Sequence, residues 1–135
     1  MTAAVDTIAA TPDEPLARFL TQSSHWHKER HQVSSSAFLP SRLATGLSVF
    51  RTTGLDARAV WALGDLHVVP SPVRRVRGAA TVIASVVTTA GLTLVRDDVP
   101  PRHAEIRNWP EEKEARKQCA LELAASASLT LRDAT

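Results

Sequence analysis

The sequence predicts an α+β fold, a single small domain in which a mixed or antiparallel sheet of about five strands is packed by two or three helices. Short segments that alternate polar and apolar residues recur along the chain, as expected for half-buried strands. Segments with helical spacing of apolar residues lie between them, and the longest, residues 110–127, is near the C-terminus. The 135 residues, of which 44% are hydrophobic, suffice for one core and are too few for two domains.

The N-terminal part combines a flexible start with a predicted helix. Residues 1–14 are small, polar and rich in alanine, so we expect a flexible segment followed by one domain over residues 15–135. Pro15 suits the first position of a helix because it has no N–H to leave unpaired. The apolar residues that follow share one face of that helix: Leu16, Phe19 and Leu20.

A polar cluster rich in histidine follows at residues 23–32, SSHWHKERHQ. If Ser24 caps a helical turn, His27 and His31 lie four residues apart on one face, the spacing with which a helix presents two imidazoles to a metal ion. Two histidines are half a zinc site and no HExxH motif is present, so we predict no metal and no other cofactor, with these histidines as the weak candidates. The alternatives are a solvated helix end anchored by Trp26 and a basic surface that faces phosphate groups.

Two strands are predicted next. Residues 33–39 alternate up to a proline, and their three serines lack the GxSxG turn that accompanies many nucleophiles. Residues 46–51, GLSVFR, carry bulky apolar side chains on both faces, which predicts a strand inside the sheet. Arg51 at its end is either an ordinary rim residue or an arginine that binds an anionic ligand.

A short helix and a basic loop come next. Asp56 can cap a helix over residues 54–64, and Gly64 can end it in a left-handed conformation. Residues 66–69 are expected to form another strand. Candidate anion-binding arginines cluster in the loop that follows: Arg74, Arg75 and Arg77. No aromatic residue interleaves with them and no glycine-rich turn accompanies them, so a solvated charged loop is the alternative.

An uncharged segment follows the arginines. Residues 78–95 carry no charge across 18 positions, as in a membrane-spanning segment with a basic cytoplasmic flank. The segment is at the lower limit of length for a span and holds five Ser or Thr residues. We therefore predict a strand at 80–83, a helix at 84–90 and a strand at 92–96, with no membrane partner. The aspartate pair that follows faces water in a turn or, alternatively, binds a divalent cation.

Residues 100–110, PPRHAEIRNWP, place three polar side chains in one row of an extended segment. The row consists of His103, Glu105 and Arg107. His103 and Glu105 are candidate catalytic residues and Arg107 is a candidate anion-binding residue, whereas a solvent-facing strand with a modest salt bridge is the alternative. Pro110 then opens the longest helix, and residues 128–132 supply an edge strand.

The composition bounds the function only loosely. A net charge of +2 and a pI near 9.2 permit contact with nucleic acid without requiring it. Thirteen of the 16 basic residues are arginines, which either bind phosphate or carboxylate groups or reflect a GC-rich genome. The single cysteine, Cys119, is expected to be a buried thiol and cannot form an internal disulfide. The N-terminus has no secretory signal pattern, so we expect a cytoplasmic protein.

Four segments of the chain are similar to an uncharacterised group of small bacterial proteins. They are SVFR at residues 48–51, GL at residues 54–55, WALG at residues 61–64 and PPRHAEIRNWP at residues 100–110. The resemblance spans roughly Val33 to Arg132. It implies a single-domain bacterial protein and brings with it no known activity and no role for any residue.

Two functions of different classes follow from these observations. The first is a small bacterial accessory protein, not an enzyme, that binds another protein or nucleic acid through an arginine-bearing surface, with a larger protein as the expected partner. The alternative is an enzyme of nucleotide, phosphoryl or ADP-ribosyl chemistry, in which Arg51 and Arg107 hold an anion and His103 or Glu105 acts as general base. We favour the first because the sequence assembles no catalytic motif. It leaves the oligomeric state open.

Overall fold

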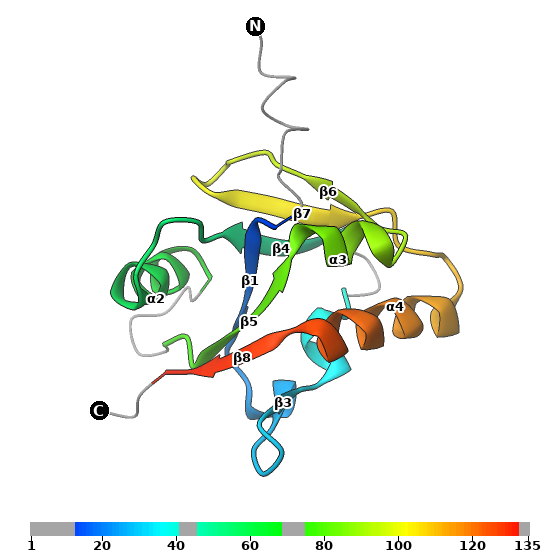
Figure 1. Ribbon diagram of the computed structural model, residues 1–135, viewed down its shortest axis with the longest axis horizontal. Helices are drawn as coiled ribbons and strands as arrows, with labels where there is room; N and C mark the ends of the chain where they lie inside the picture. Colours follow the sequence, from blue (N-terminus) through cyan, green and yellow to red (C-terminus); the bar gives the residue numbers. More distant parts are fainter. Residues whose placement is uncertain (1–12, 41–45, 69–74, 133–135) are drawn as a thin grey trace, which may run out of the picture.

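The computed structural model describes residues 13–40, 46–68 and 75–132, and its architecture is α+β, as predicted (Figure 1). A six-stranded sheet has the order β6-β7-β4-β1-β5-β8, and all its neighbouring strands are antiparallel. Its strands are β1 Pro15–Leu20, β4 Gly46–Arg51, β5 Gly78–Ile83, β6 Thr93–Val95, β7 His103–Arg107 and β8 Ser128–Leu131. A second sheet consists of β2 Trp26–His27 and β3 Gln32–Val33.

The described residues contain three α-helices and two short 3₁₀-helices. These are α2 Ala57–His67, α3 Ala84–Thr89, α4 Lys113–Ser126, η1 Ser23–His25 and η2 Ser35–Phe38. The longest, α4, lies near the C-terminus as predicted. The interior position of β4 and the edge position of β8 are confirmed as well.

Apolar side chains are buried on both faces of the large sheet. On one face they pack against η2, α3 and α4, where Phe38 and Leu123 are both 0% exposed. On the other face, Phe19 and Phe50 pack against the half-buried side chains of α2, among them Trp61. In Figure 1, α2 accordingly lies to the left of β1 and β5, and α4 to the right. The sheet is therefore the middle layer, and most of its central strands are buried on both sides.

The predicted helix that begins at Pro15 was wrong, because this segment is the central strand β1. Leu16 and Leu20 face the larger core, whereas Ala17 and Phe19 face the smaller one. A strand buried on both faces has apolar residues at successive positions, and these also satisfy the helical spacing. Pairing of all six residues of β1 with β5 is what selects the extended form.

Two other predicted strands were wrong. The strand expected over residues 33–39 stops at Val33, and η2 follows because the chain turns to bury Phe38 against the core. In place of the strand expected over residues 66–69, α2 continues to His67; residue 69 is outside the described ranges. Gly64 lies inside that helix and does not end it.

The C-terminal helix was predicted correctly but starts later than Pro110. Asn108 has a φ of 70°, and the indole N–H of Trp109 donates to the Ile106 carbonyl at 2.8 Å, so the chain first reverses direction. The helix then begins at Lys113 and buries a narrow face of small side chains. Cys119 is 8% exposed on that face, which confirms the buried thiol, and burial raises its pKa.

The uncharged segment 78–95 forms β5, α3 and β6, as predicted. Among the described residues, no helix combines the length and the apolar character needed to cross a membrane. Glu14, the last residue of the segment predicted to be flexible, is only 9% exposed and is ion-paired; residues 1–12 lie outside the described ranges.

Candidate functional site

Strands β4 and β7 bring the polar row of the sequence next to a serine. In their antiparallel register Phe50 lies opposite His103, and Ser48 lies opposite Glu105. All four side chains therefore project from the same face of the sheet. The intervening residues of β7 are fully buried on the other face, which holds this strand in place.

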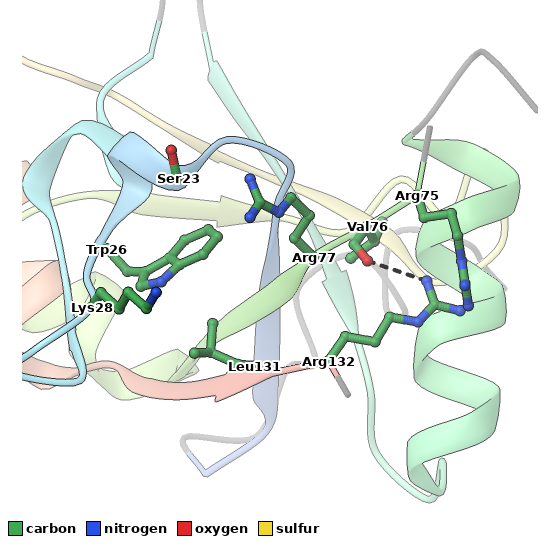
Figure 2. A pocket seen from close by; sticks show the side chains of 8 residues that line it. All are labelled: Ser23, Trp26, Lys28, Arg75, Val76, Arg77, Leu131 and Arg132. Carbon is green, nitrogen blue, oxygen red and sulfur yellow. Dashed lines mark hydrogen bonds between the residues drawn. The ribbon is translucent and has the colours of Figure 1, made fainter. Parts of the chain in front are cut away.

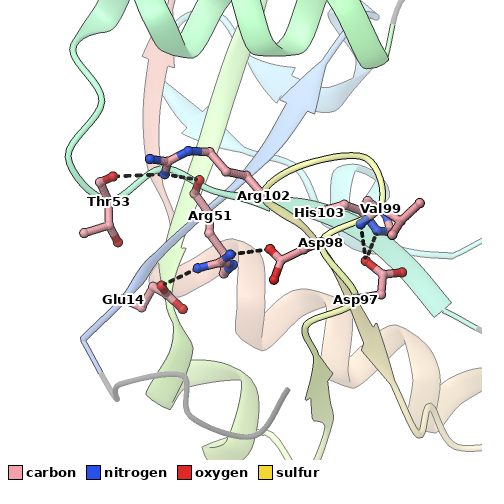
Figure 3. Close-up of polar contacts among 8 residues, drawn as sticks. All are labelled: Glu14, Arg51, Thr53, Asp97, Asp98, Val99, Arg102 and His103. Carbon is pink, nitrogen blue, oxygen red and sulfur yellow. Dashed lines mark hydrogen bonds and ion pairs between the residues drawn. The ribbon is translucent and has the colours of Figure 1, made fainter. Parts of the chain in front are cut away.

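His103 links a serine to an aspartate. Its Nδ1 lies 2.6 Å from Asp97 Oδ1, and its Nε2 lies 3.0 Å from Ser48 Oγ (the aspartate contact is drawn in Figure 3). His103 is 8% exposed, and its ring makes an edge contact with the Phe50 ring at a centroid distance of 5.4 Å. Burial alone would raise the pKa of Asp97, but hydrogen bonds from His103 and from the Val99 N–H lower it below its usual value.

An arginine occupies a gap in the sheet beside this serine. β1 and β4 pair at only two positions, Leu16 with Arg51 and Ala17 with Phe50. Where the strands part, Arg18 donates from Nε to the Ala37 carbonyl at 2.9 Å and from Nη1 to the Ser48 carbonyl at 3.1 Å. The described residues give it no carboxylate partner, and burial lowers its pKa.

A cavity of about 330 Å³, called here the Ser48 pocket, opens at this point. Its lining residues come from β1, β4, the end of α2, the turn before β7 and the start of β7: Arg18, Phe19, Ser48, Phe50, His67, Val68, Pro100 and His103. The His67 ring stacks on Phe50 at a centroid distance of 5.8 Å. The pocket thus combines an apolar wall with a serine, two imidazoles and a guanidinium.

Arg51 lies nearby, but its charge is already neutralised (Figure 3). It pairs with Glu14 at 3.2 Å and also with Asp98, and its side chain is 15% exposed. Burial alone would lower the pKa of Arg51, but the hydrogen bonds to Asp98 and Glu14 raise it. Arg102 holds the adjacent turn by donating to the carbonyls of Arg51 and Thr53.

The predicted site residues do not all lie together in the structure. Arg107 lies opposite Gly46 at the other end of β4 from Arg51, so the two arginines do not converge. Arg107 pairs with Glu105 at 2.6 Å. Of the polar row, His103 lines the Ser48 pocket, whereas Glu105 and Arg107 are not among the residues that line it.

A second cavity, of about 570 Å³ and called here the Trp26 pocket, is strongly basic (Figure 2). Its lining residues come from three separate parts of the chain: Ser23, Trp26, Lys28, Arg75, Val76, Arg77, Leu131 and Arg132. The Arg77 guanidinium lies 5.3 Å from the centre of the Trp26 ring. Lys28, Arg75 and Arg77 are exposed and have no carboxylate partner among the described residues. Arg74 lies outside the described residues.

Arg132 is the exception in the Trp26 pocket because Asp65 neutralises it. The two groups are 2.9 Å apart, and Asp65 Oδ1 also accepts from the Val76 N–H at 3.0 Å. Arg132 donates to the Val76 carbonyl as well, and it lies 5.6 Å from the Trp61 ring. This network joins α2 to the chain before β5 and to β8.

The Asp65 pair predicts a specific loss of stability in acid. The hydrogen bond from Arg132 lowers the pKa of Asp65 below its usual 3.8. A lowered pKa stabilises the fold fully above about pH 5, and the stabilisation disappears as the pH falls through the folded-state pKa. We expect Asp65→Asn to cost about 0.5–1 kcal/mol at pH 7 and to reduce the decline in unfolding free energy between pH 6 and pH 3. Urea unfolding at each pH measures this, with Arg132→Gln as a second variant; an unchanged decline in both contradicts the role of the pair.

The histidines proposed as metal candidates do not share a helical face. His27 lies in β2 opposite Gln32, and His31 follows in the turn with a φ of 51°. His31 Nε2 is 3.2 Å from the Leu129 carbonyl. The helical spacing predicted for this pair was therefore wrong. Within the described ranges, no group of three or more potential metal ligands is assembled.

Three residues of these pockets were not predicted as site residues: Ser48, Arg18 and Trp26. Ser48 was visible as the polar position inside a strand predicted to be buried, and Arg18 as the charged residue within PLARFL. Both patterns are unusual for a central strand and signal a polar partner. Trp26 gave no such signal, because the arginines that share its pocket are 49 or more positions away in sequence.

The fold, the Trp26 pocket and the Ser48 pocket define a small α+β protein with a basic cavity that holds an indole ring and a separate polar cavity beside β1 and β4. Comparison of the chain with protein-family models, with curated proteins and with solved structures finds no match.

Proposed function

We propose that the protein is a small accessory protein that binds single-stranded nucleic acid through the Trp26 pocket. The observation that carries this proposal is a single cavity lined by the half-buried indole of Trp26 and by three exposed cations, Lys28, Arg75 and Arg77, of which Arg77 lies over the ring. Proteins that bind single strands without sequence preference combine cations that follow the phosphates with aromatic rings on which bases stack. The sequence alone separated these two components, and the pocket contains both.

The charge of the pocket supports an anionic ligand. Three cations without a carboxylate partner among the described residues line one cavity. Arg132 lines it as well, but its charge is neutralised by Asp65. Neutralising three phosphates of a single strand gives a salt slope of about −2, so affinity falls roughly 20-fold between 50 and 200 mM salt. Such binding is weak, non-specific and salt-dependent.

Fluorescence anisotropy with a labelled twelve-nucleotide oligothymidine tests the proposal. We expect salt-sensitive binding that Arg77→Glu abolishes and that Trp26→Leu weakens by about 5- to 150-fold, the equivalent of roughly 1–3 kcal/mol for one stacked base. Arg107→Glu is the matched control, because it reverses an exposed arginine on another part of the surface. Thermal unfolding of each variant separates lost binding from lost folding, since Trp26 also packs against the core.

Binding that is absent, or equal in Arg77→Glu and Arg107→Glu, overturns the nucleic-acid function. Co-purification of a larger acidic protein that depends on Arg77 would instead favour the protein-binding version. The enzyme of nucleotide, phosphoryl or ADP-ribosyl chemistry takes second place, because Arg51 and Arg107 are each engaged by carboxylates. A bacterial origin and a cytoplasmic location complete the proposal.

A further inference from the structure

We propose that Ser48, His103 and Asp97 form a nucleophilic serine site that hydrolyses a small carboxylic ester in the Ser48 pocket. This activity is separate from nucleic-acid binding, because the Ser48 pocket and the Trp26 pocket share no lining residue. Either function can therefore fail without the other.

The first support is the order of the hydrogen bonds. The serine oxygen is 3.0 Å from one ring nitrogen of His103, and the aspartate oxygen is 2.6 Å from the other. A nucleophile, a base and a group that orients the base are thus connected in series at hydrogen-bond distances, which is the arrangement of a serine triad on any fold. Ser48 and His103 stand on two paired strands whose adjacent residues Val49 and Ala104 are 0% exposed. Rigid strands of this kind hold catalytic side chains more accurately than loops do.

The second support is the state of the aspartate. A carboxylate at Nδ1 favours the imidazole tautomer that carries its proton on that nitrogen, so Nε2 is left as the acceptor facing Ser48. The lowered pKa of Asp97 keeps this carboxylate ionised at neutral pH. Asp97 also accepts from the Val99 N–H, which fixes its position in the turn. Asp97 is therefore a positioning residue for His103.

The third support is the Arg18 guanidinium, because Arg18 lines the pocket. A guanidinium has five N–H donors, and Arg18 uses two of them on the carbonyls of Ala37 and Ser48. Its bond to the Ser48 carbonyl places it beside the residue that carries the nucleophile. Since the described residues provide no carboxylate for it, its remaining donors can stabilise the oxyanion that forms during acyl transfer.

The shape of the pocket limits the substrate. A volume of about 330 Å³ is at the lower end for small-molecule sites. Phe19, Phe50, Val68 and Pro100 form its apolar wall. We therefore assign it an ester with a short apolar acyl chain.

The reaction balances without a cofactor. Ser48 Oγ attacks the carbonyl carbon while His103 Nε2 accepts the hydroxyl proton, and the new oxyanion faces Arg18. The bond to the leaving oxygen breaks, His103 returns the proton to that oxygen, and acyl-Ser48 remains. Water then attacks the acyl group, His103 accepts its proton and passes it to Ser48, and the products are one acid and one alcohol.

Two measurements on the full chain test the site: labelling by a fluorophosphonate probe, located by peptide mass spectrometry, and hydrolysis of p-nitrophenyl butyrate. We expect labelling at Ser48 and hydrolysis above the buffer rate. Ser48→Ala should abolish both, whereas Ser36→Ala should change neither, because Ser36 bonds only to Ser24 and Ser34 on the surface. Asp97→Asn should lower kcat by about 10³–10⁴-fold with little change in KM, as expected when the imidazole loses its orientation.

Thermal unfolding should show that Ser48→Ala and Asp97→Asn remain folded. Absent labelling and hydrolysis in the unaltered protein, or hydrolysis that persists in folded Ser48→Ala, overturns the assignment. Equal kcat in Asp97→Asn and the unaltered protein overturns the role of Asp97. A result of ester hydrolysis without oligothymidine binding, or the reverse, shows which of the two pockets is functional.

Discussion

Replacing Phe38 by alanine is expected to lower the free energy of unfolding by about 3–5 kcal/mol, the usual cost of deleting a buried aromatic ring. Phe38 is 0% exposed and is the largest fully buried side chain of the described core. It lies in η2, which packs closely against α4. Its removal leaves a cavity where two segments far apart in sequence meet. Since domains of this size have only about 5–15 kcal/mol of stability, the loss is a large share of the total.

Urea unfolding followed by far-UV circular dichroism measures this effect as a lower midpoint at unchanged slope. The neighbouring Leu39→Ala is the matched control, because Leu39 is 42% exposed and its loss should cost about 0.5 kcal/mol or less. If Phe38→Ala does not fold, Phe38→Leu should still be folded and less stable than Leu39→Ala. Equal costs for Phe38→Leu and Leu39→Ala would mean that η2 is not docked as described.

The second large effect concerns Gly64 inside α2, where alanine is expected to lower the free energy of unfolding although it usually raises it in a helix. Gly→Ala normally stabilises a helix interior by about 1 kcal/mol. A Cβ on Gly64, however, would lie 2.8 Å from Phe19 Cδ1 and 2.9 Å from Val76 Cγ2. Both neighbours are buried in the smaller core, at 5% and 1% exposure, so they have little room to move. We expect Gly64→Ala to destabilise the protein by about 1–3 kcal/mol through overpacking.

A second substitution that makes room for the new methyl group tests whether overpacking is the cause of the destabilisation. Phe19→Leu removes the ring atoms nearest to the new methyl group, so Gly64→Ala should cost less in the Phe19→Leu background than alone. Thermal or urea unfolding of the four proteins gives the coupling energy directly. A Gly64→Ala protein that is more stable than the unaltered chain is the outcome that excludes close contact of α2 with the sheet.

The Ser48 pocket and the Trp26 pocket form at different places in the sheet. The Ser48 pocket exists because β1 and β4 separate after two paired positions and Arg18 fills the gap. The Trp26 pocket lies where the β2–β3 hairpin, the chain before β5 and the end of β8 come together (Figure 2). Both therefore require the correct strand order, because each pocket combines residues from separate parts of the chain.

Local patterns predicted the elements whose periodicity or whose ends carry clear signals. The strand GLSVFR, the series of strand, helix and strand over residues 78–95, and the C-terminal helix are all present. Asp56 caps α2 as predicted, through a 2.8 Å bond to the Ala59 N–H. Prediction failed at β1 because burial on both faces erases the period of two that distinguishes a strand from a helix.

The candidate sites were predictable only in part. His103 was identified from its place in an alternating row, and Arg75 and Arg77 from their clustering. Their partners were not, because Ser48 is 55 positions from His103 and Trp26 is 51 positions from Arg77. Arg51 and Arg107 looked equally available for an anion, yet carboxylates from the turn after β6, from the residue before β1 and from β7 neutralise them.

By itself, the sequence determined the α+β class, the single small domain, most helix and strand types, and several residues that could take part in binding or catalysis. These depend on hydrophobic period and capping, which act over a few residues. Only the tertiary structure decided the order of the strands, the two-sided burial of β1, the joining of Ser48 to His103 and Asp97, and the arginines left without a carboxylate. These depend on strand register and on contacts across long loops, for which local sequence carries no period and no spacing rule.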